Sequence, residues 1–111
     1  SDYFIFEIDH HPIGCVALHA YPEQQKGELA FLYVNPSHEN QGIGVKLIQF
    51  VEDQARQSGL NSLFLLSTQA FAFFHTKAAY MEGQPDDLPA IRRKKYMENG
   101  RNSRILVKSL T

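Results

Sequence analysis

The stretch that decides the fold is Glu28-Leu-Ala-Phe-Leu-Tyr-Val-Asn-Pro-Ser-His-Glu-Asn-Gln-Gly-Ile-Gly44. Its first part, Glu28 to Val34, is mostly apolar and partly β-branched or aromatic, which predicts a strand inside a sheet. The Asn35-Pro-Ser37 that follows predicts the end of that strand. Beyond it, apolar residues at roughly helical spacing predict an amphipathic helix from about Gly44 to Gln57. We therefore expect a buried strand, a turn rich in backbone amides and the N-terminus of a helix.

A glycine-containing turn at a helix N-terminus predicts a site for an anion. Glycine adopts backbone dihedral angles that other residues disfavour, and it lets a ligand approach the main chain closely. The amides of Gln41, Gly42, Ile43, Gly44 and Val45 would point to one spot outside the helix, where the helix dipole also favours negative charge. A pyrophosphate would fit there. An ordinary strand-to-helix turn is the alternative, and the spacing alone does not choose between the two.

The same loop resembles that of a known family. Glu39-Asn-Gln-Gly-Ile-Gly44 is similar to the (Gln/Arg)-x-x-Gly-x-(Gly/Ala) loop with which the GNAT acetyltransferases hold the pyrophosphate of acetyl-coenzyme A. The first position departs from this pattern, because Glu39 is an acid where the family usually has Gln or Arg. A carboxylate repels a phosphate, so we expect Glu39 to face solvent and the amides to carry the binding.

The GNAT resemblance implies acetyl-CoA as cosubstrate, no metal, and contacts through the main chain of the strand. The exposed amides of Phe31 or Leu32 would polarise the acetyl carbonyl. Tyr33 and Val34 would pair with the pantetheine arm as if it were another strand.

A second resemblance lies near the C-terminus. Asp87-Leu-Pro-Ala-Ile-Arg-Arg-Lys-Lys-Tyr96 and Asn99-Gly-Arg-Asn-Ser-Arg-Ile-Leu-Val-Lys-Ser-Leu110 are similar to the end of the bacterial N-acetylglutamate synthase family, and the likeness extends over nearly the whole chain. It implies transfer of an acetyl group from acetyl-CoA to the α-amino group of L-glutamate, a step of arginine biosynthesis. Alternatives are a GNAT enzyme for another amine, or a non-catalytic module that binds acetyl-CoA.

The resemblance also implies roles for single residues. Glu28, in the Gly-Glu-(Leu/Ile)-Ala position, would be the general base, and Ser67, in Leu-(Ser/Thr)-Thr, would protonate the leaving thiolate. Arg101 and Ser103 would contact a carboxylate of glutamate. The alternatives are a solvent-facing strand end for Glu28, a helix cap for Ser67 and a surface salt bridge for Arg101. His75 stands where many GNAT enzymes have a tyrosine, and it is a second candidate for the proton donor.

The fold class expected is α/β, with a mixed, mostly antiparallel sheet and flanking helices. The patterns predict a hairpin of strands over 3–8 and 13–18, a strand over 63–66, a helix over 70–78, a helical stretch over 92–96 and a strand over 104–110. The GNAT fold usually has one strand and two helices before the strand that begins here near Tyr3. We interpret residues 1–111 as one acetyltransferase domain. Because the chain starts with Ser, this domain is interpreted as a possible fragment of a longer chain.

Composition excludes several other functions. A net charge of -1 and a pI near 6.5 argue against nucleic-acid binding, although the run Arg92-Arg-Lys-Lys95 is basic and is interpreted as a solvated helix face or a site near an anionic substrate. No apolar run is long enough to span a membrane. The single cysteine, Cys15, excludes an internal disulfide and suits a reducing cytoplasm. A bare edge strand would favour a homo-oligomer.

Overall fold

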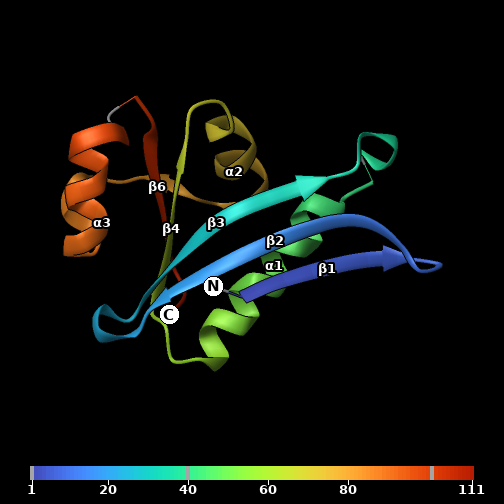
Figure 1. The fold of residues 1–111 in the computed structure, drawn as a ribbon, viewed down its shortest axis with the longest axis horizontal. Coiled ribbons are helices and arrows are strands. Elements are labelled where there is room, and N and C mark those ends of the chain that lie inside the picture. The colour runs from blue at the N-terminus through green and yellow to red at the C-terminus, as the bar shows by residue number, and fades with distance from the viewer. Residues whose placement is uncertain (1, 40, 101) are drawn as a thin grey trace.

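The chain folds around one mixed β-sheet in a computed structural model that describes residues 2–39, 41–100 and 102–111 (Figure 1). Within these residues the strands are β1 (Asp2–Ile8), β2 (His11–Tyr21), β3 (Lys26–Val34), β4 (Ser62–Ser67), β5 (Met81–Glu82) and β6 (Arg104–Ser109). Their order in the sheet is β1-β2-β3-β4-β6-β5. The α-helices are α1 (Ile43–Gln57), α2 (Phe71–Ala78) and α3 (Ala90–Lys95), and α3 continues into a π-helical turn over Tyr96–Gly100.

The expected fold class is confirmed. The pair β3 and β4 is parallel, and the other neighbouring strands described are antiparallel. The sequence did not predict β5, because two residues are too short for a periodic pattern. The helix α3 also begins before residue 92, since Pro89 is its N-cap and Ala90 its first residue. Since β1 lies at one end of the sheet, the expectation of a homo-oligomer through this edge stays a prediction.

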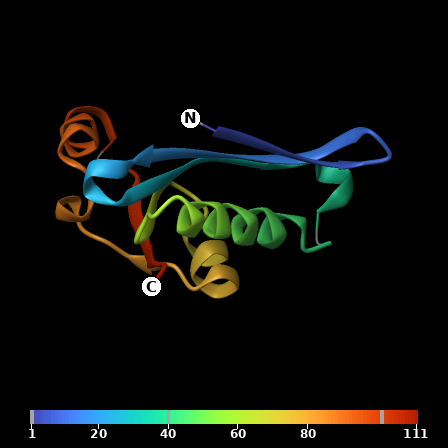
Figure 2. The same ribbon diagram turned by 90° about the horizontal axis from the view of Figure 1, so that it is seen from below.

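Helices cover opposite faces of the sheet, with α1 on one face and α3 on the other (Figure 2). The buried residues of α1 recur at helical spacing, as the sequence predicted. Full burial of such an apolar side chain stabilises the fold by about 1.5 to 3 kcal/mol. The core on this side includes Val16, Leu18, Leu29, Ile43, Leu47, Ile48, Val51, Ala55, Leu63, Leu65 and Leu106. A smaller cluster on the α3 side contains Phe64, Leu88 and Ile105. None of the helices described is long and apolar enough to cross a membrane.

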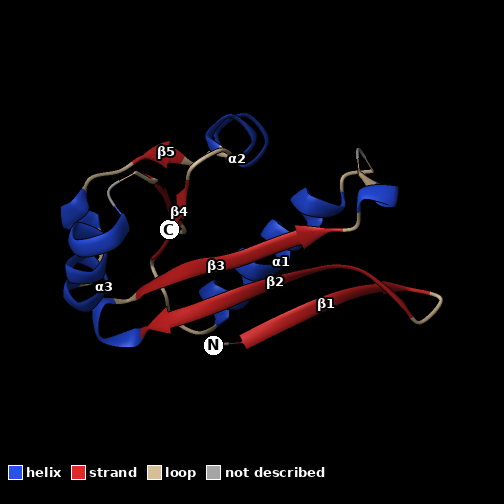
Figure 3. Cartoon of the chain, turned by 45° about the horizontal axis from the view of Figure 1, so that its top comes forward, coloured by secondary structure: helices blue, strands red, loops and turns tan. Residues whose placement is uncertain are grey.

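The feature that positions the site is an opening between β3 and β4. These strands pair only where Lys26 to Glu28 meet Ser62 to Phe64, and beyond that point they run apart (Figures 1 and 3). A β-bulge in β3 lies just after the last pair, because Ala17 faces Phe31 and Leu18 faces Leu29. A bulge bends the strand that contains it, so β3 turns away from β4 at Ala30.

The end of α2 contains a residue in a strained conformation. Ala79 is its C-cap and has a left-handed φ of 63°. A side chain in that conformation costs roughly 1 to 2 kcal/mol, a cost that glycine avoids. We expect Ala79→Gly to raise the free energy of unfolding by about 1 kcal/mol, measured by urea denaturation. Ala72→Gly, an exposed position inside the same helix, should lower it by about 0.5 to 1 kcal/mol. Equal effects of the two changes would contradict this account.

Candidate active site

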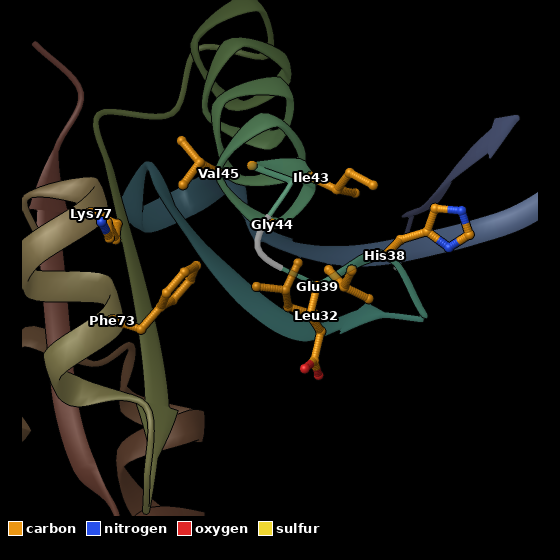
Figure 4. Close-up of a pocket in the computed structure, with 10 residues that line it drawn as sticks. Leu32, His38, Glu39, Ile43, Gly44, Val45, Phe73 and Lys77 are labelled. Carbon is orange, nitrogen blue, oxygen red and sulfur yellow. The ribbon is translucent and has the colours of Figure 1, made fainter. Parts of the chain in front are cut away.

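A cavity of about 590 Å³ lies between the end of β3, the start of α1 and the face of α2 that carries Phe73 and Lys77. Figure 4 shows Phe73 and Lys77 of α2 on one side of it, with Leu32 of β3 and Val45 of α1 on the other. Its lining residues are Leu32, Val34, His38, Glu39, Gly42, Ile43, Gly44, Val45, Phe73 and Lys77. The strand, the turn and the helix start that the sequence singled out therefore border one cavity.

The helix end of this cavity is suited to an anion. Gly42 is the N-cap of α1, and the first helical bond runs from the amide of Lys46 to its carbonyl oxygen, at 3.1 Å. The amides of Ile43, Gly44 and Val45 precede that bond and so have no acceptor within the helix. The Lys77 ammonium adds positive charge to the same cavity. Gln41 is exposed beside the cavity without lining it.

Gly44 keeps the cavity open because it lacks a side chain. A Cβ atom at this position would lie 3.3 Å from Cζ of Phe73 and 3.8 Å from Cγ2 of Val34. The carboxylate of Glu39 points away from the start of the helix, and its side chain is exposed, as expected (Figure 4). In the part of the chain that the structure describes, Nδ1 of His38, a residue that lines this cavity, is buried without a hydrogen-bond partner.

The conformation of Gly42 gives a direct test of the anion site. Gly42 has a φ of +77°, Gly59 at the end of α1 has a φ of +83°, and neither has a heavy atom within 4 Å of an added Cβ. Alanine should therefore cost about 1 to 2 kcal/mol of stability at either position. We expect Gly42→Ala alone to weaken acetyl-CoA binding, because only this strain reorients amides at the cavity. Calorimetric titration with acetyl-CoA measures the affinity of both variants. Equal affinities of Gly42→Ala and Gly59→Ala would show that the turn is not part of the site.

The backbone N–H and C=O groups of successive β3 residues point alternately toward β2 and toward the opening between β3 and β4. The amide of Asn35 donates to the carbonyl oxygen of Ile13 in β2, at 2.7 Å. Because hydrogen-bonding residues alternate along an antiparallel strand, Tyr33 and Phe31 also direct their main chain toward β2. Leu32 and Val34 then direct theirs into the opening. Of the four residues expected to contact the cosubstrate, these two are placed to do so through the backbone, whereas the side chains of Phe31 and Tyr33 are each 48% exposed.

Glu28 lies where β3 and β4 separate, since it belongs to the last residue pair between them. The residue is only 8% exposed, and its carboxylate accepts from Arg92 through Nε to Oε1 at 2.9 Å and Nη2 to Oε2 at 3.2 Å. It borders a second cavity, of about 480 Å³, next to α3. That cavity is lined by His19, Tyr21, Glu28, Ala30, Ile91, Arg92 and Lys95. Glu28 is thus not a solvent-facing strand end.

Tyr21 is a neighbour of Glu28 that sequence reasoning missed. Burial and, next, the Glu28 carboxylate raise the pKa of the Tyr21 hydroxyl, against a smaller opposing effect of the Arg92 guanidinium. The hydroxyl is therefore neutral, and a possible donor, at physiological pH. Its only signal in the sequence is its place at the end of a strand, which does not distinguish it from a structural tyrosine.

The basic run of α3 differs in part from the expected solvated face. Lys94 and Lys95 are exposed, but Arg92 and Arg93 are partly buried. Arg93 donates to the carbonyl oxygens of Pro85 and Leu88, at 3.2 and 3.1 Å. The interpretation as a solvated face is wrong for these two arginines, because Arg93 has acceptors in the preceding loop and Arg92 has the Glu28 carboxylate of β3.

Ser67, at the end of β4, has a local partner for its hydroxyl oxygen. Its Oγ accepts from the amides of Gln69 at 3.2 Å and Ala70 at 2.8 Å, ahead of α2. These amides precede α2, whose N-cap is Ala70 without a side-chain hydrogen bond, so Ser67 closes the turn before the helix and the helix-cap alternative is wrong. A hydroxyl that accepts two hydrogen bonds still has its own proton to donate, so the turn does not conflict with the proposed role as proton donor.

His75 is less suited to give a proton. Its Nδ1 lies 2.8 Å from the carbonyl oxygen of Tyr80, and its ring stacks on Phe71 at a centroid distance of 5.3 Å. A carbonyl oxygen can only accept, so Nδ1 carries a hydrogen and Nε2 of the neutral ring is an acceptor. Nδ1 is thus engaged with the Tyr80 carbonyl oxygen, and only Nε2 is left to contact another group.

The residues expected to bind the acceptor are only partly described. Arg101 lies outside the described residues. Ser103 directly precedes β6, whose Arg104 pairs with Ser67 of β4, so Ser103 lies at the same end of the sheet as Ser67. The carbonyl oxygen of Ser103 accepts from the Tyr96 hydroxyl at 3.2 Å. In the described ranges 2–39, 41–100 and 102–111 no group of three His, Cys, Asp or Glu side chains is arranged to hold a metal.

Comparison with known proteins agrees with this geometry. The chain belongs to the acetyltransferase (GNAT) family, whose model matches residues 1–92. It is 40% identical over 110 residues to an amino-acid acetyltransferase of Neisseria meningitidis, an alignment that covers 99% of this chain and 25% of that protein. An amino-acid acetyltransferase of Ralstonia nicotianae is 38% identical, with 99% of this chain and 24% of that protein covered.

A solved structure shows the same likeness in three dimensions. N-acetylglutamate synthase from Neisseria gonorrhoeae, complexed with coenzyme A and N-acetyl-glutamate, has a TM-score of 0.91 and 39% identity to this chain, with 98% of this chain and 26% of that one covered. Both resemblances stated from the sequence are confirmed. The chain spans about a quarter of the length of the relatives it matches.

Proposed function

We propose that this domain, over residues 1–111, transfers the acetyl group of acetyl-CoA to the α-amino group of L-glutamate. The observation that carries the proposal is the place of Glu28. Its buried carboxylate lies where β3 and β4 separate, at the inner end of the opening that leads to the cavity at the start of α1. It also borders the cavity beside α3, so cosubstrate and acceptor can reach it from two sides.

The cosubstrate would lie along the opening. Its pyrophosphate would accept from the amides at the start of α1, chiefly Ile43 and Gly44, with Lys77 as a nearby cation. The amide groups of the pantetheine arm would pair with the main chain of Leu32 and Val34. The thioester would then lie close to the point where the strands meet, which is next to Glu28.

The reaction needs a neutral amine and a proton for the departing thiolate. Glu28, directly or through a water molecule, would take a proton from the ammonium group of the acceptor. The amine nitrogen then attacks the acetyl carbon, the carbon–sulfur bond breaks, and the Ser67 hydroxyl gives its proton to the sulfur. The nitrogen loses its second proton as the amide forms, and this proton restores the Ser67 hydroxyl, directly or through a water molecule. The amides of Gln69 and Ala70 donate to the Ser67 oxygen and hold it in position.

The choice of L-glutamate is supported by the relatives. They are named amino-acid acetyltransferase, and the similar Neisseria gonorrhoeae structure is complexed with N-acetyl-glutamate. Arg101 and Ser103 would bind one carboxylate of the acceptor, because a guanidinium fork with a neighbouring hydroxyl suits that group.

The test is calorimetric titration with acetyl-CoA, followed by L-glutamate and a thiol-release readout in the same sample. We expect binding, and release of thiol only after glutamate is added. Release with a different amino acid would keep the enzyme class and change the acceptor. Binding without release, under any acceptor, would identify a binding module, and no binding would overturn the proposal.

Variants of Ser67 separate its two roles. Ser67→Ala should lose both the two hydrogen bonds of the turn before α2, worth about 1 kcal/mol of stability, and the proton donor. Ser67→Asn keeps a side-chain oxygen that accepts from the same kind of turn amides, yet it has no hydroxyl proton to give. We therefore expect Asn to restore stability in urea denaturation and to leave turnover reduced by about 10²-fold or more. Normal turnover in Ser67→Asn would leave Ser67 with the turn before α2 as its only role.

A further inference from the structure

Arg92 contacts the proposed general base with only one edge of its guanidinium group. That edge, formed by Nε and Nη2, donates to the two carboxylate oxygens of Glu28. A guanidinium has five N–H donors in a fixed plane, so two hydrogen bonds leave three donors. Among the residues that the structure describes, Glu28 is the acceptor recorded for Arg92. The Arg92 side chain remains 22% exposed.

The cavity in front of this pair is suited to a negatively charged molecule. Glu28 and Arg92 neutralise each other on its wall, and Lys95 of the same helix also lines it. An amino acid with two carboxylates needs a cationic partner for each, and Arg101 with Ser103 accounts for one. Arg92 is the cation that already lies beside the base.

We propose that Arg92 joins the general base to the acceptor: its Nε and Nη2 edge holds Glu28, and its Nη1 side binds a carboxylate of the acceptor amino acid. This inference rests on the proposed function and adds to it a residue that selects the substrate. A guanidinium can offer an edge with two donors to each of two carboxylates, whereas the ammonium group of lysine has three donors on one atom and no such edges. One side chain thereby fixes the distance between the base and the amine that it deprotonates.

The test compares Arg92→Gln and Arg92→Lys with Lys94→Gln, which removes the same charge from an exposed position of α3. Calorimetry measures binding of L-glutamate to the protein saturated with coenzyme A. We expect Arg92→Gln to weaken this binding at least about tenfold, the effect of losing one charge-assisted contact, and Lys94→Gln to leave it unchanged. Affinity for coenzyme A should be equal in all variants, which shows that each one is folded.

Two analogues of glutamate make the assignment specific. L-glutamine lacks the side-chain carboxylate and glutamic acid 1-amide lacks the α-carboxylate. In the unsubstituted protein each should bind more weakly than glutamate. In Arg92→Gln the penalty should disappear for one analogue, the one missing the carboxylate that Arg92 binds, and persist for the other.

Arg92→Lys distinguishes binding from structural support. Lysine keeps the charge beside Glu28 but cannot hold both carboxylates, so kcat/KM for glutamate should fall at least about tenfold while the protein stays folded. Unchanged glutamate affinity and unchanged penalties for both analogues in Arg92→Gln would overturn the inference and leave the proposed function intact. Failure of the unsubstituted protein to bind glutamate would overturn both.

Discussion

Replacing Glu28 with Gln is expected to lower the turnover number by about 10²- to 10⁴-fold, the usual contribution of a general base. Glutamine has nearly the same shape and its amide oxygen can still accept from Arg92, but it cannot take a proton from the acceptor. Since Glu28 does not line the cavity at the start of α1, the affinity for acetyl-CoA should not change. Steady-state thiol release and calorimetric titration measure the two quantities on the same preparation.

The control for this change is Glu39→Gln. Glu39 is an exposed carboxylate that lines the cavity at the start of α1, so its replacement removes an equal charge without removing the proposed base. It should leave turnover unaffected and, if anything, tighten acetyl-CoA binding by removing repulsion from the phosphates. Turnover near that of the unsubstituted protein in Glu28→Gln would show that another group accepts the proton.

Replacing Lys108 with Met is expected to cost about 3 to 5 kcal/mol of stability, because it leaves a buried carboxylate without its cation. Glu52 of α1 is 4% exposed and accepts from Nζ of Lys108 at 3.0 to 3.1 Å and from the Tyr80 hydroxyl at 3.0 Å. Burial, followed by the neighbouring Glu52 charge, raises the pKa of Tyr80 far above its usual value, so Tyr80 stays a neutral donor and cannot replace the cation. Urea denaturation measures the loss.

Two further variants separate burial of charge from loss of packing. The double variant Glu52→Gln with Lys108→Met has no buried charge left, so most of the stability should return. Asp53→Asn breaks the exposed pair of Asp53 with Arg56, at 3.0 Å, and should cost no more than about 0.5 kcal/mol. If Lys108→Met were as mild as Asp53→Asn, the Glu52 charge would have to be solvated after the change.

The Glu52 network also links the elements that border the cavity at the start of α1. It joins α1 to β6 through Lys108 and to the turn after α2 through Tyr80. The carbonyl oxygen of Tyr80 in turn accepts from His75 of α2. Loss of Lys108 should therefore weaken acetyl-CoA binding as well as the fold, since the spacing of α1 and α2 determines the width of the cavity.

The sequence predicted well those elements whose signals lie in neighbouring residues of the chain. The strand from Glu28, the turn and α1 follow from periodicity and from glycine at Gly42 and Gly44, and these signals depend on neighbours in the chain. The family loop added the ligand that such a turn would hold. These elements lie where the sequence placed them and they border the same cavity.

What the sequence missed depends on contacts between distant residues. Glu28 and Arg92 are 64 positions apart, and Glu52 and Lys108 are 56 apart, so no local period brings either pair together. Arg92 belongs to a run of four cations, which on composition alone resembles a solvated helix face. Its partial burial arises because α3 lies beside the start of β3, where Arg92 contacts Glu28, and that placement is a property of the whole fold.

Because β3 diverges from β4, we expect the amides of β3 to exchange hydrogen as those of an edge strand do, although β3 is an interior strand of the sheet. Asn35 donates to β2, and Tyr33 and Phe31 follow by alternation, so their amides should exchange slowly with solvent deuterium. The amides of Leu32 and Val34, between them, should exchange fast although their strand lies in the middle of the sheet. A bound pantetheine arm would protect those two positions and leave the others as they were. Binding of the cosubstrate would then appear as protection of every second amide along β3. Hydrogen exchange could detect this pattern even in a variant that catalyses no reaction.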